Sequence, residues 1–338
     1  MHGFMMRYMS IQDSKLPIKP NTVSRIISSI VLLMIVGGFL IFHLLLGQAP
    51  PWSPTITNHQ SSVSALWIRN NIYINPDKQT KLITAGGKLL LIGSDMSNNS
   101  SRLIALDEIT GNNVWQYGDT NENTLAASPS IVFVGEVGNV IALDSDTGRI
   151  IWSSQLPFTR SVTKLLTMDS TLYVDTVSKN HFLLEMETGK IIQSISYATD
   201  NVPIWSDHRM NLELVGNNMY FQKRSGLPNG EVEIIAIDKL SGTQYWSAIV
   251  PVASSIVANS LGVFVLTLDG RLLRLDPISG IEKELIQFEP APLQRYYSER
   301  GTTREYGYHV AVDTDNQLVF VYLGDSAQLF AYRLSIAP

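Results

Sequence analysis

A thirteen-residue phrase recurs five times along this chain and constrains its fold more than any other feature. It reads LIALDEITGNNVW at 103–115, VIALDSDTGRIIW at 140–152 and IIAIDKLSGTQYW at 234–246. Two weaker copies, FLLEMETGKIIQS and LLRLDPISGIEKE, occupy 182–194 and 272–284. Each copy is an apolar run, an acidic residue, three further residues and a Gly. Repeats spaced by a few tens of residues indicate a stacked or circular architecture.

The chain around these copies has the pattern of short antiparallel strands. From residue 63 onward, apolar segments rich in Val, Ile, Leu, Tyr and Phe alternate with Gly, Asn, Asp and Ser. Residues 124–152 predict four strands, A to D, joined by tight turns. The same order fits four other stretches, 81–117, 162–195, 211–248 and 254–288.

A sixth unit is split between the two ends of this region. It begins near Gly307 and ends after three strands, while residues 64–69 (SALWIR) resemble the missing fourth strand. Pairing the two would close a ring and leave fewer open sheet edges. The sequence therefore predicts an all-β protein, a β-propeller of six four-stranded antiparallel blades closed by an N-terminal strand.

The repeated residues have structural roles in this interpretation. We expect the acid that ends strand C to accept hydrogen bonds from the amides of the C–D turn. We expect the Gly to adopt the positive φ that this turn requires, and the Trp to fill the gap between blades. The residues concerned are Asp107, Gly111, Trp115, Asp144, Gly148, Trp152, Glu185, Gly189, Asp238, Gly242, Trp246, Asp276 and Gly280.

The copies IALDEITGNNVW, IALDSDTGRIIW and IAIDKLSGTQYW resemble the repeat of PQQ-like (quinoprotein-type) β-propellers, and the resemblance covers roughly residues 64–338. It implies the fold but not the function. The repeat occurs in quinoprotein dehydrogenases, in the propeller lipoprotein of the outer-membrane assembly machinery and in anchored proteins without an assigned role.

The enzymatic members of that family have eight blades, a Trp floor beneath the quinone, an adjacent Cys pair and Glu, Asn and Asp ligands for calcium. This chain has no Cys and is long enough for about six blades. The quinone-binding residues therefore have no matching positions, and we predict no cofactor, no metal site and no catalytic residue. The six His are scattered through the sequence, so we interpret them as surface or turn residues.

The N-terminal region predicts a membrane anchor. Residues 26–47 are 22 residues without a formal charge, enough to cross a bilayer as a helix. Four Lys and Arg precede this segment and none follows until Arg69, which places the N-terminus in the cytoplasm. We predict a cytoplasmic tail (1–25), a transmembrane signal anchor (26–47), a Pro- and Ser-rich stalk (48–62) and an extracytoplasmic propeller (63–338). The alternative is a signal peptide cleaved near residues 47–49.

The part of the chain beyond the predicted anchor carries 21 Lys and Arg against 29 Asp and Glu, a net charge of −8. Electrostatics of this sign do not favour nucleic-acid binding, so we expect no nucleic-acid partner.

The irregular segments fall together at one end of the predicted ring. In a four-stranded meander, A–B and C–D turns share one face, and B–C and D–A connections share the other. The longest segments, 94–101, 196–210, 223–231 and 289–306, are all of the second kind, and loops on a rigid scaffold are where binding residues gather. The candidate partner-binding residues are Arg295, Tyr296, Tyr297, Arg300, Arg304, Tyr306, Trp205, His208 and Arg209.

We therefore expect a single-pass, membrane-anchored scaffold or binding module for a protein or envelope polymer. Two alternatives remain open at this point. One is a quinoprotein dehydrogenase or another enzyme that uses the loop face. The other is a sensor of a small ligand, although a cytoplasmic tail of this length has no room for an output domain.

Overall fold

The computed structural model describes residues 60–74, 82–95, 102–118, 124–157, 161–177, 180–196, 211–223, 231–289, 296–297, 303–304 and 307–334. The predicted tail, the predicted span at 26–47 and nearly all of the predicted stalk lie outside this part of the chain. No helix among the described residues is long and apolar enough to cross a membrane. The anchor and the cellular location of the propeller therefore stay predictions.

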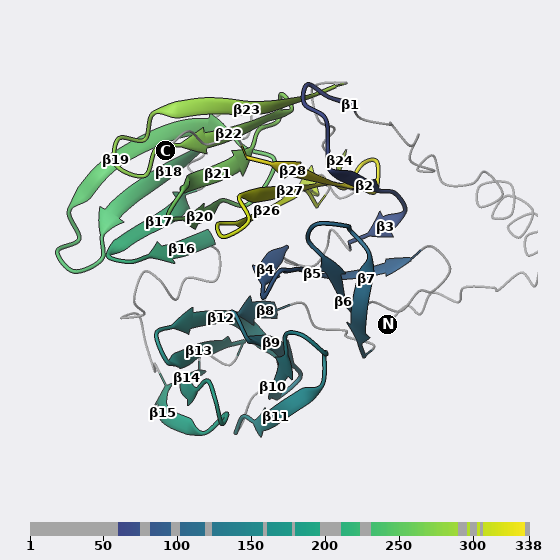
Figure 1. Cartoon of the computed structure of the whole chain (residues 1–338). Helices are drawn as coiled ribbons and strands as arrows, with labels where there is room; N and C mark the ends of the chain where they lie inside the picture. The colour runs from purple at the N-terminus through teal and green to yellow at the C-terminus, as the bar shows by residue number, and fades with distance from the viewer. Residues whose placement is uncertain are drawn as a thin grey trace, which may run out of the picture. The chain divides into compact units, whose positions relative to one another are not determined.

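Six antiparallel blades of four strands each form the propeller, and a fifth short strand extends the sheets of two of them (Figure 1). Blade 1 holds β4 (Ile83–Ala85), β5 (Lys88–Asp95), β6 (Arg102–Asp107) and β7 (Asn113–Tyr117). Blade 2 holds β8 (Thr124–Ala127), β9 (Ile131–Glu136), β10 (Asn139–Asp144) and β11 (Ile150–Gln155). Blade 3 holds β12 (Val162–Met168), β13 (Thr171–Thr176), β14 (Asn180–Glu185) and β15 (Ile191–Ser196).

The second half of the chain repeats this order. Blade 4 holds β16 (Asn211–Val215), β17 (Asn218–Lys223), β18 (Glu231–Asp238) and β19 (Gln244–Pro251). Blade 5 holds β20 (Val257–Asn259), β21 (Gly262–Leu266), β22 (Arg271–Leu275) and β23 (Glu282–Glu289). The three C-terminal strands of blade 6 are β26 (His309–Asp313), β27 (Leu318–Leu323) and β28 (Gln328–Arg333). The prediction of an all-β, six-bladed propeller is confirmed.

An N-terminal strand completes blade 6. Strand β2 (Trp67–Arg69) pairs antiparallel with β28, with Trp67 opposite Ala331 and Arg69 opposite Leu329. The closure predicted from SALWIR is therefore present. The blade is made from both ends of the propeller sequence, so the sheet itself joins the first blade to the last.

Two further short strands extend this closure to the neighbouring blades. Strand β1 (Gln60–Ser61) pairs with the end of β23 in blade 5, and β3 (Ile72–Tyr73) pairs with β5 in blade 1. The hydroxyl of Tyr322 in blade 6 donates to the carbonyl of Ile72 at 2.9 Å. Residues 60–74, which we call the N-terminal strap, thus tie blades 5, 6 and 1 together.

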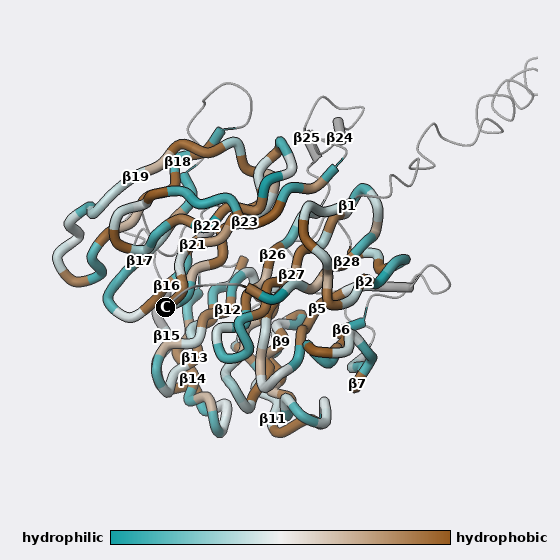
Figure 2. The backbone as a smooth tube through the Cα atoms, turned by 45° about the horizontal axis from the view of Figure 1, so that its top comes forward, coloured by the Kyte–Doolittle hydropathy of each residue, from teal (hydrophilic) through white to brown (hydrophobic). Residues whose placement is uncertain are grey.

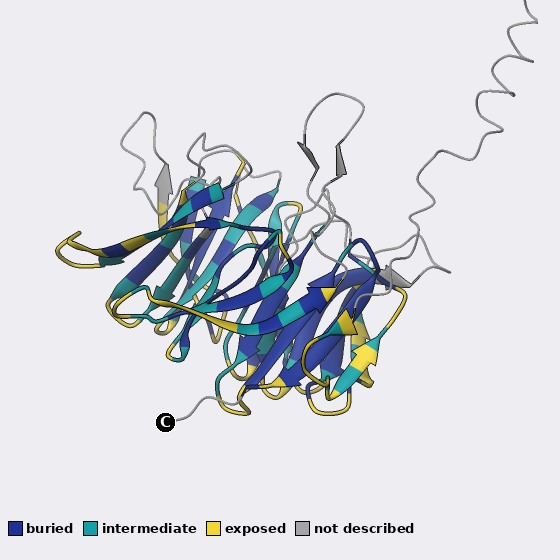
Figure 3. Cartoon of the chain, turned by 90° about the horizontal axis from the view of Figure 1, so that it is seen from above, coloured by how far each residue is buried: buried dark blue, intermediate teal, exposed yellow. Residues whose placement is uncertain are grey.

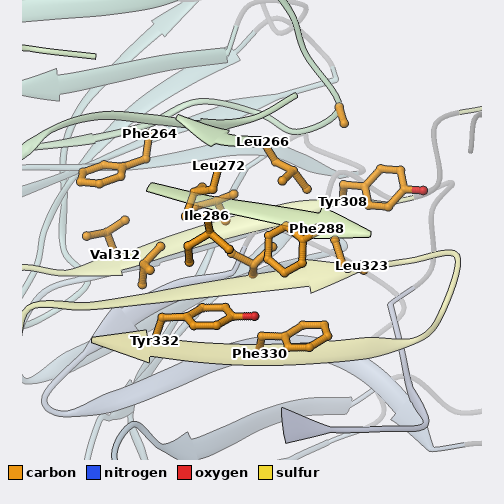
Figure 4. Packing of buried hydrophobic residues seen from close by; sticks show 14 of the residues in the cluster. Phe264, Leu266, Leu272, Ile286, Phe288, Tyr308, Val312, Leu323, Phe330 and Tyr332 are labelled. Carbon is orange, nitrogen blue, oxygen red and sulfur yellow. The ribbon is translucent and has the colours of Figure 1, made fainter. Parts of the chain in front are cut away.

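The core lies between the blades. Buried residues form five clusters, and each cluster joins two neighbouring blades. Figure 4 shows the cluster between blades 5 and 6, where Phe288, Phe330 and Tyr332 pack beside Ile286 and Leu323. The hydrophobic positions run along the strands, and exposed residues gather at the turns (Figures 2 and 3). Burial of apolar surface between stacked sheets is the main stabilising term in such a fold.

Candidate partner-binding face

The C–D turn is built in the same way wherever the repeated phrase occurs. In blade 1, Oδ1 of Asp107 accepts from the amide of Thr110 at 2.8 Å and from its hydroxyl at 2.8 Å. The Gly111 amide then donates to the Asp107 carbonyl at 2.8 Å, closing the turn at φ +71°. Thr147, Thr188, Ser241 and Ser279 take the place of Thr110 in the other copies. The acid, the hydroxyl residue and the Gly are all engaged in shaping this turn.

Hydrogen bonding explains the electrostatics of these turns. The amide and hydroxyl of Ser241, with the hydroxyl of Tyr245, lower the pKa of Asp238 to about 2. The pKa values of Asp107, Asp144 and Asp276 are lowered by bonds of the same kind. Each acid sits on a different blade, so the acids do not converge on one centre. Among the described residues, no group of three or more His, Asp or Glu could hold a metal ion.

In the three phrases that contain a Trp, its side chain docks on the turn of the next blade. The indole Nε1 of Trp115 in blade 1 donates to the carbonyl of Ser145 in blade 2 at 2.9 Å. Its ring lies where a side chain on Gly148 would be, with only 2.7 Å between a Cβ built there and the indole. Trp67, Trp152 and Trp246 make the corresponding bonds to the carbonyls of Glu108, Met186 and Pro277. We call this contact the indole lock, and it gives the Trp a structural role as well.

The sequence assigns the nine candidate residues to the other end of the ring. Tyr296 and Tyr297 form β24, and Arg304 belongs to β25 (Thr303–Arg304), labelled in Figure 2. The two strands pair antiparallel, with Tyr296 opposite Arg304. Arg295, Arg300, Tyr306, Trp205, His208 and Arg209 lie outside the described residues. The structure therefore brings together three of the nine candidates, in one hairpin of the connection between blades 5 and 6.

The base of this connection is held on both sides. Where the chain leaves blade 5, Glu289 pairs with Gln60 of the N-terminal strap. Where it enters blade 6, Tyr308 forms a parallel bridge with Ser254 and is buried. The hairpin is therefore carried on anchored ends, the arrangement expected of a binding loop on a rigid scaffold.

The interpretation of the His residues as surface or turn residues is wrong for His181. This residue lies in the strand β14 and is 3% exposed. Its Nδ1 lies 2.5 Å from the hydroxyl of Tyr173 and 3.2 Å from Oδ1 of Asp175. Burial lowers the pKa of His181, against the effect of Asp175. Burial likewise lowers the pKa of His309 to about 4.

A second buried polar group was also missed from the sequence. Glu108 follows the repeated Asp107 and is 1% exposed. Its Oε2 accepts from the side-chain amide of Asn316, which also donates to Asp313 at 2.7 Å. Burial first, and then the neighbouring Asp313 carboxylate, raise the pKa of Glu108 to about 8. Glu108 belongs to the C–D turn side and links blade 1 to blade 6, so it lies away from the candidate face.

The fold and its turns define a propeller of PQQ-like repeats. The family described as outer membrane protein assembly factor BamB matches residues 74–165, 99–227 and 136–288, well over half of the chain. The chain belongs to this family. No curated protein matches it in a comparison of sequences.

Solved structures agree with the fold only. A chain of the mitotic checkpoint complex matches 84% of this chain and 96% of its own length, with a TM-score of 0.54 and 11% identity. BamB from Moraxella catarrhalis matches 75% of this chain and 71% of its own, at 15% identity, but with a TM-score of 0.33 that carries no argument about shape. Altogether 1462 chains match, and likeness this widespread does not define an activity.

Proposed function

We propose that this protein is a membrane-anchored, extracytoplasmic propeller that binds protein partners in envelope assembly and performs no chemistry of its own. The observation that carries the proposal is that the repeated residues and the hairpin residues have different roles. The repeated Asp, Gly and Trp are engaged in turns and indole locks, whereas the Tyr296–Arg304 hairpin stands on a held base at the opposite end.

The composition of the hairpin suits a protein partner. Tyr and Arg are enriched among the residues that contribute most to binding at interfaces. Tyr296, Tyr297 and Arg304 place both types on paired strands, where the backbone limits the entropy lost on binding. Membership of a family described as an outer membrane protein assembly factor supports partners of the envelope-assembly kind.

The buried polar network of blade 3 does not argue for an enzyme. Tyr173, Asp175 and His181 are each 3% exposed and bond to one another. A general base must reach its substrate within hydrogen-bonding distance, and these side chains are almost fully buried. We assign them a structural role.

The test is a crosslinking pull-down with the intact protein in its native membrane. One variant carries Tyr296→Ala, Tyr297→Ala and Arg304→Ala. The matched control carries Ile109→Ala, Leu240→Ala and Ile278→Ala, three exposed apolar residues at equivalent positions of the C–D turns. We expect the first variant to lose partners that the control keeps. Equal recovery of partners by both variants would show that the hairpin residues do not bind these partners.

A further inference from the structure

Two acidic side chains from different blades meet at one amide group where the ring closes. Glu108 follows the repeated Asp107 in the C–D turn of blade 1, and Asp313 is the last residue of β26 in blade 6. The side-chain amide of Asn316 donates to Oε2 of Glu108 at 3.3 Å and to Oδ2 of Asp313 at 2.7 Å. A single amide group therefore links the two carboxyl groups across the junction.

The carboxyl group of Glu108 has few hydrogen-bond donors for a buried acid. Glu108 is 1% exposed, and among the described residues its Oε1 has no hydrogen-bond partner. The backbone fixes its position, because the Glu108 amide donates to the carbonyl of Gly87 at 3.2 Å and the Glu108 carbonyl accepts from the indole of Trp67 at 2.9 Å. A buried polar atom without a partner requires an explanation, and a bound ion is one.

The surrounding charges do not offset the negative charge of this pair. The charged side chains that act most strongly on Glu108 are those of Asp313 and Asp107, and both are acidic. Two basic side chains on neighbouring strands are engaged elsewhere. Arg69 of β2 donates to the backbone and to an Asn side chain of the blade 1 turn, and Lys88 of β5 pairs with an Asp of blade 2. The buried pair therefore needs either a proton or a cation.

The available ligands are those of a hard cation. Ca²⁺ accepts carboxylate oxygens and the side-chain oxygen of Asn, and water completes its coordination. Asn316 is exposed, so its amide can rotate and present its oxygen to the two carboxyl groups. Mg²⁺ fits less well, because it demands near-ideal octahedral geometry and loses water reluctantly. With three side chains from the protein, we expect a Kd on the order of 0.1–1 mM, the range of extracellular calcium-binding modules.

We propose that Glu108, Asp313 and Asn316 bind a calcium ion that joins blade 6 to blade 1 at the closure of the ring. The sequence did not predict this site, because its ligands come from opposite ends of the propeller sequence. A calcium ion and a proton compete for the Glu108 carboxyl group, so calcium binds as the proton leaves. The site lies on the side of the C–D turns, and the proposal stands without the proposed function.

The experiment measures thermal unfolding of the full-length protein in detergent micelles, followed by Trp fluorescence at about pH 8.5. The carboxyl group of Glu108, whose pKa is about 8, is then mostly ionised. One sample contains a chelator, a second about 5 mM calcium chloride, and a third sodium chloride at the same ionic strength. We expect calcium to raise Tm by about 2–4 °C above both other samples. A shift no larger than that of sodium chloride would overturn the calcium site.

Three variants assign the shift to the proposed ligands. Glu108→Gln and Asp313→Asn should each remove most of the calcium-dependent shift, whereas Glu284→Gln, at an exposed position of β23, should retain it. At about pH 5 the shift of the unchanged protein should also disappear, because a proton then occupies Glu108. An undiminished shift in Glu108→Gln, or in the unchanged protein at this lower pH, would place the calcium elsewhere and overturn the proposal.

Terbium luminescence measures binding without reference to stability. Tb³⁺ takes the same oxygen ligands as Ca²⁺, and its emission is excited through a nearby aromatic ring. The indole of Trp67 is hydrogen-bonded to the Glu108 carbonyl, so it lies beside the proposed site. We expect emission that rises with added terbium, falls when calcium displaces it, and is largely lost in Glu108→Gln. Equal emission from Glu108→Gln and from the unchanged protein would show that the ion binds elsewhere.

Discussion

At the scale of single residues, the turn Gly meets two separate demands. Gly148 has φ +69° and leaves room for the Trp115 indole, whereas Gly242 has φ +70° and faces open space. The backbone demand is therefore the same at both positions, and the packing demand exists at only one. The pair allows the two contributions to stability to be measured separately.

We expect Gly242→Ala to lower the free energy of unfolding by about 1 kcal/mol, the strain of an L-residue at positive φ. We expect Gly148→Ala to cost about 1–3 kcal/mol more, because its Cβ meets the indole. Urea unfolding followed by Trp fluorescence measures both values. Equal losses would show that the indole lock contributes nothing at this position.

A second residue-scale consequence concerns Glu108. Its pKa in the folded protein, about 8, lies above its ordinary value of 4.5. The folded state therefore holds a proton that the unfolded state releases. The stability that follows is fully present below pH 4.5 and is lost as the pH rises through about 8. The carboxylate of Asp313 and the amide of Asn316 face the same group.

We predict that the free energy of unfolding falls by on the order of 3 kcal/mol between about pH 5 and pH 8. Glu108→Gln, which stays neutral, should remove most of this fall. Glu284→Gln, at an exposed position of β23, serves as the control and should leave the fall in place. A Glu108→Gln protein with an unchanged pH dependence would contradict the assignment.

The roles of the repeated Asp and Gly could be predicted because the two residues act within four residues of each other. Asp107 and Thr110 meet whenever the turn forms. The burial of His181 is different, because it depends on which strands cover it. The sequence did contain a signal, since Tyr173 and Asp175 alternate on one strand and pairing places Asp175 opposite His181. Polar residues that alternate along a strand are therefore also consistent with a buried network.

At the scale of elements, the N-terminal strap decides how the ring is closed. Strand β2 supplies both the fourth strand of blade 6 and the indole that locks blade 6 to blade 1. Its residues alternate, with Trp67 half-buried against Phe320 and Ile68 50% exposed. We therefore expect neighbouring residues of this strand to contribute differently to the stability of the protein.

We expect Trp67→Ala to destabilise the protein by about 3 kcal/mol, the cost of removing a packed aromatic side chain. Ile68→Ala should change the free energy of unfolding by less than about 0.5 kcal/mol. Both values come from urea unfolding curves of otherwise identical proteins. Comparable losses would mean that closure depends on the backbone pairing of β2 and not on the indole.

The pairing of β2 could be predicted, whereas that of β1 and β3 could not. SALWIR carries the Trp that marks a D strand. Gln60–Ser61 and Ile72–Tyr73 are two-residue strands without a periodic pattern, so only the position of their partners reveals them. Gln60 and Ser61 lie at the end of the predicted stalk, so the paired segment begins within this stretch and not after it.

At the scale of the whole molecule, the sequence predicts a propeller that is attached to a membrane anchor. The charges around residues 26–47 predict a cytoplasmic N-terminus and a propeller on the opposite side. This topology remains a prediction, and the absence of Cys from the chain makes it simple to test.

A membrane-impermeant maleimide applied to right-side-out membrane vesicles should label Ile278→Cys and spare Asp13→Cys. Detergent should then expose both positions to the reagent. Labelling of Asp13→Cys in intact vesicles, or protection of Ile278→Cys, would reverse or abolish the proposed topology. Release of the labelled propeller from washed membranes would favour the cleaved signal peptide.

The blade order could be predicted from the repeat alone. The packing between blades could not, because it depends on what two blades place opposite each other. Glu284 stands in blade 5 where three of the repeated phrases have Trp, yet Phe288, Phe330 and Tyr332 form an aromatic core at that junction. No local pattern describes this packing between blades.

We expect partners to bind the loop face and not the face of the repeated turns. This expectation is tested most directly by placing a photo-crosslinking amino acid at Tyr297, and separately at Ile278 of a C–D turn, in the full-length protein in its native membrane. We expect discrete crosslinked partners from position 297 and none from position 278. Crosslinks from position 278 alone would contradict it.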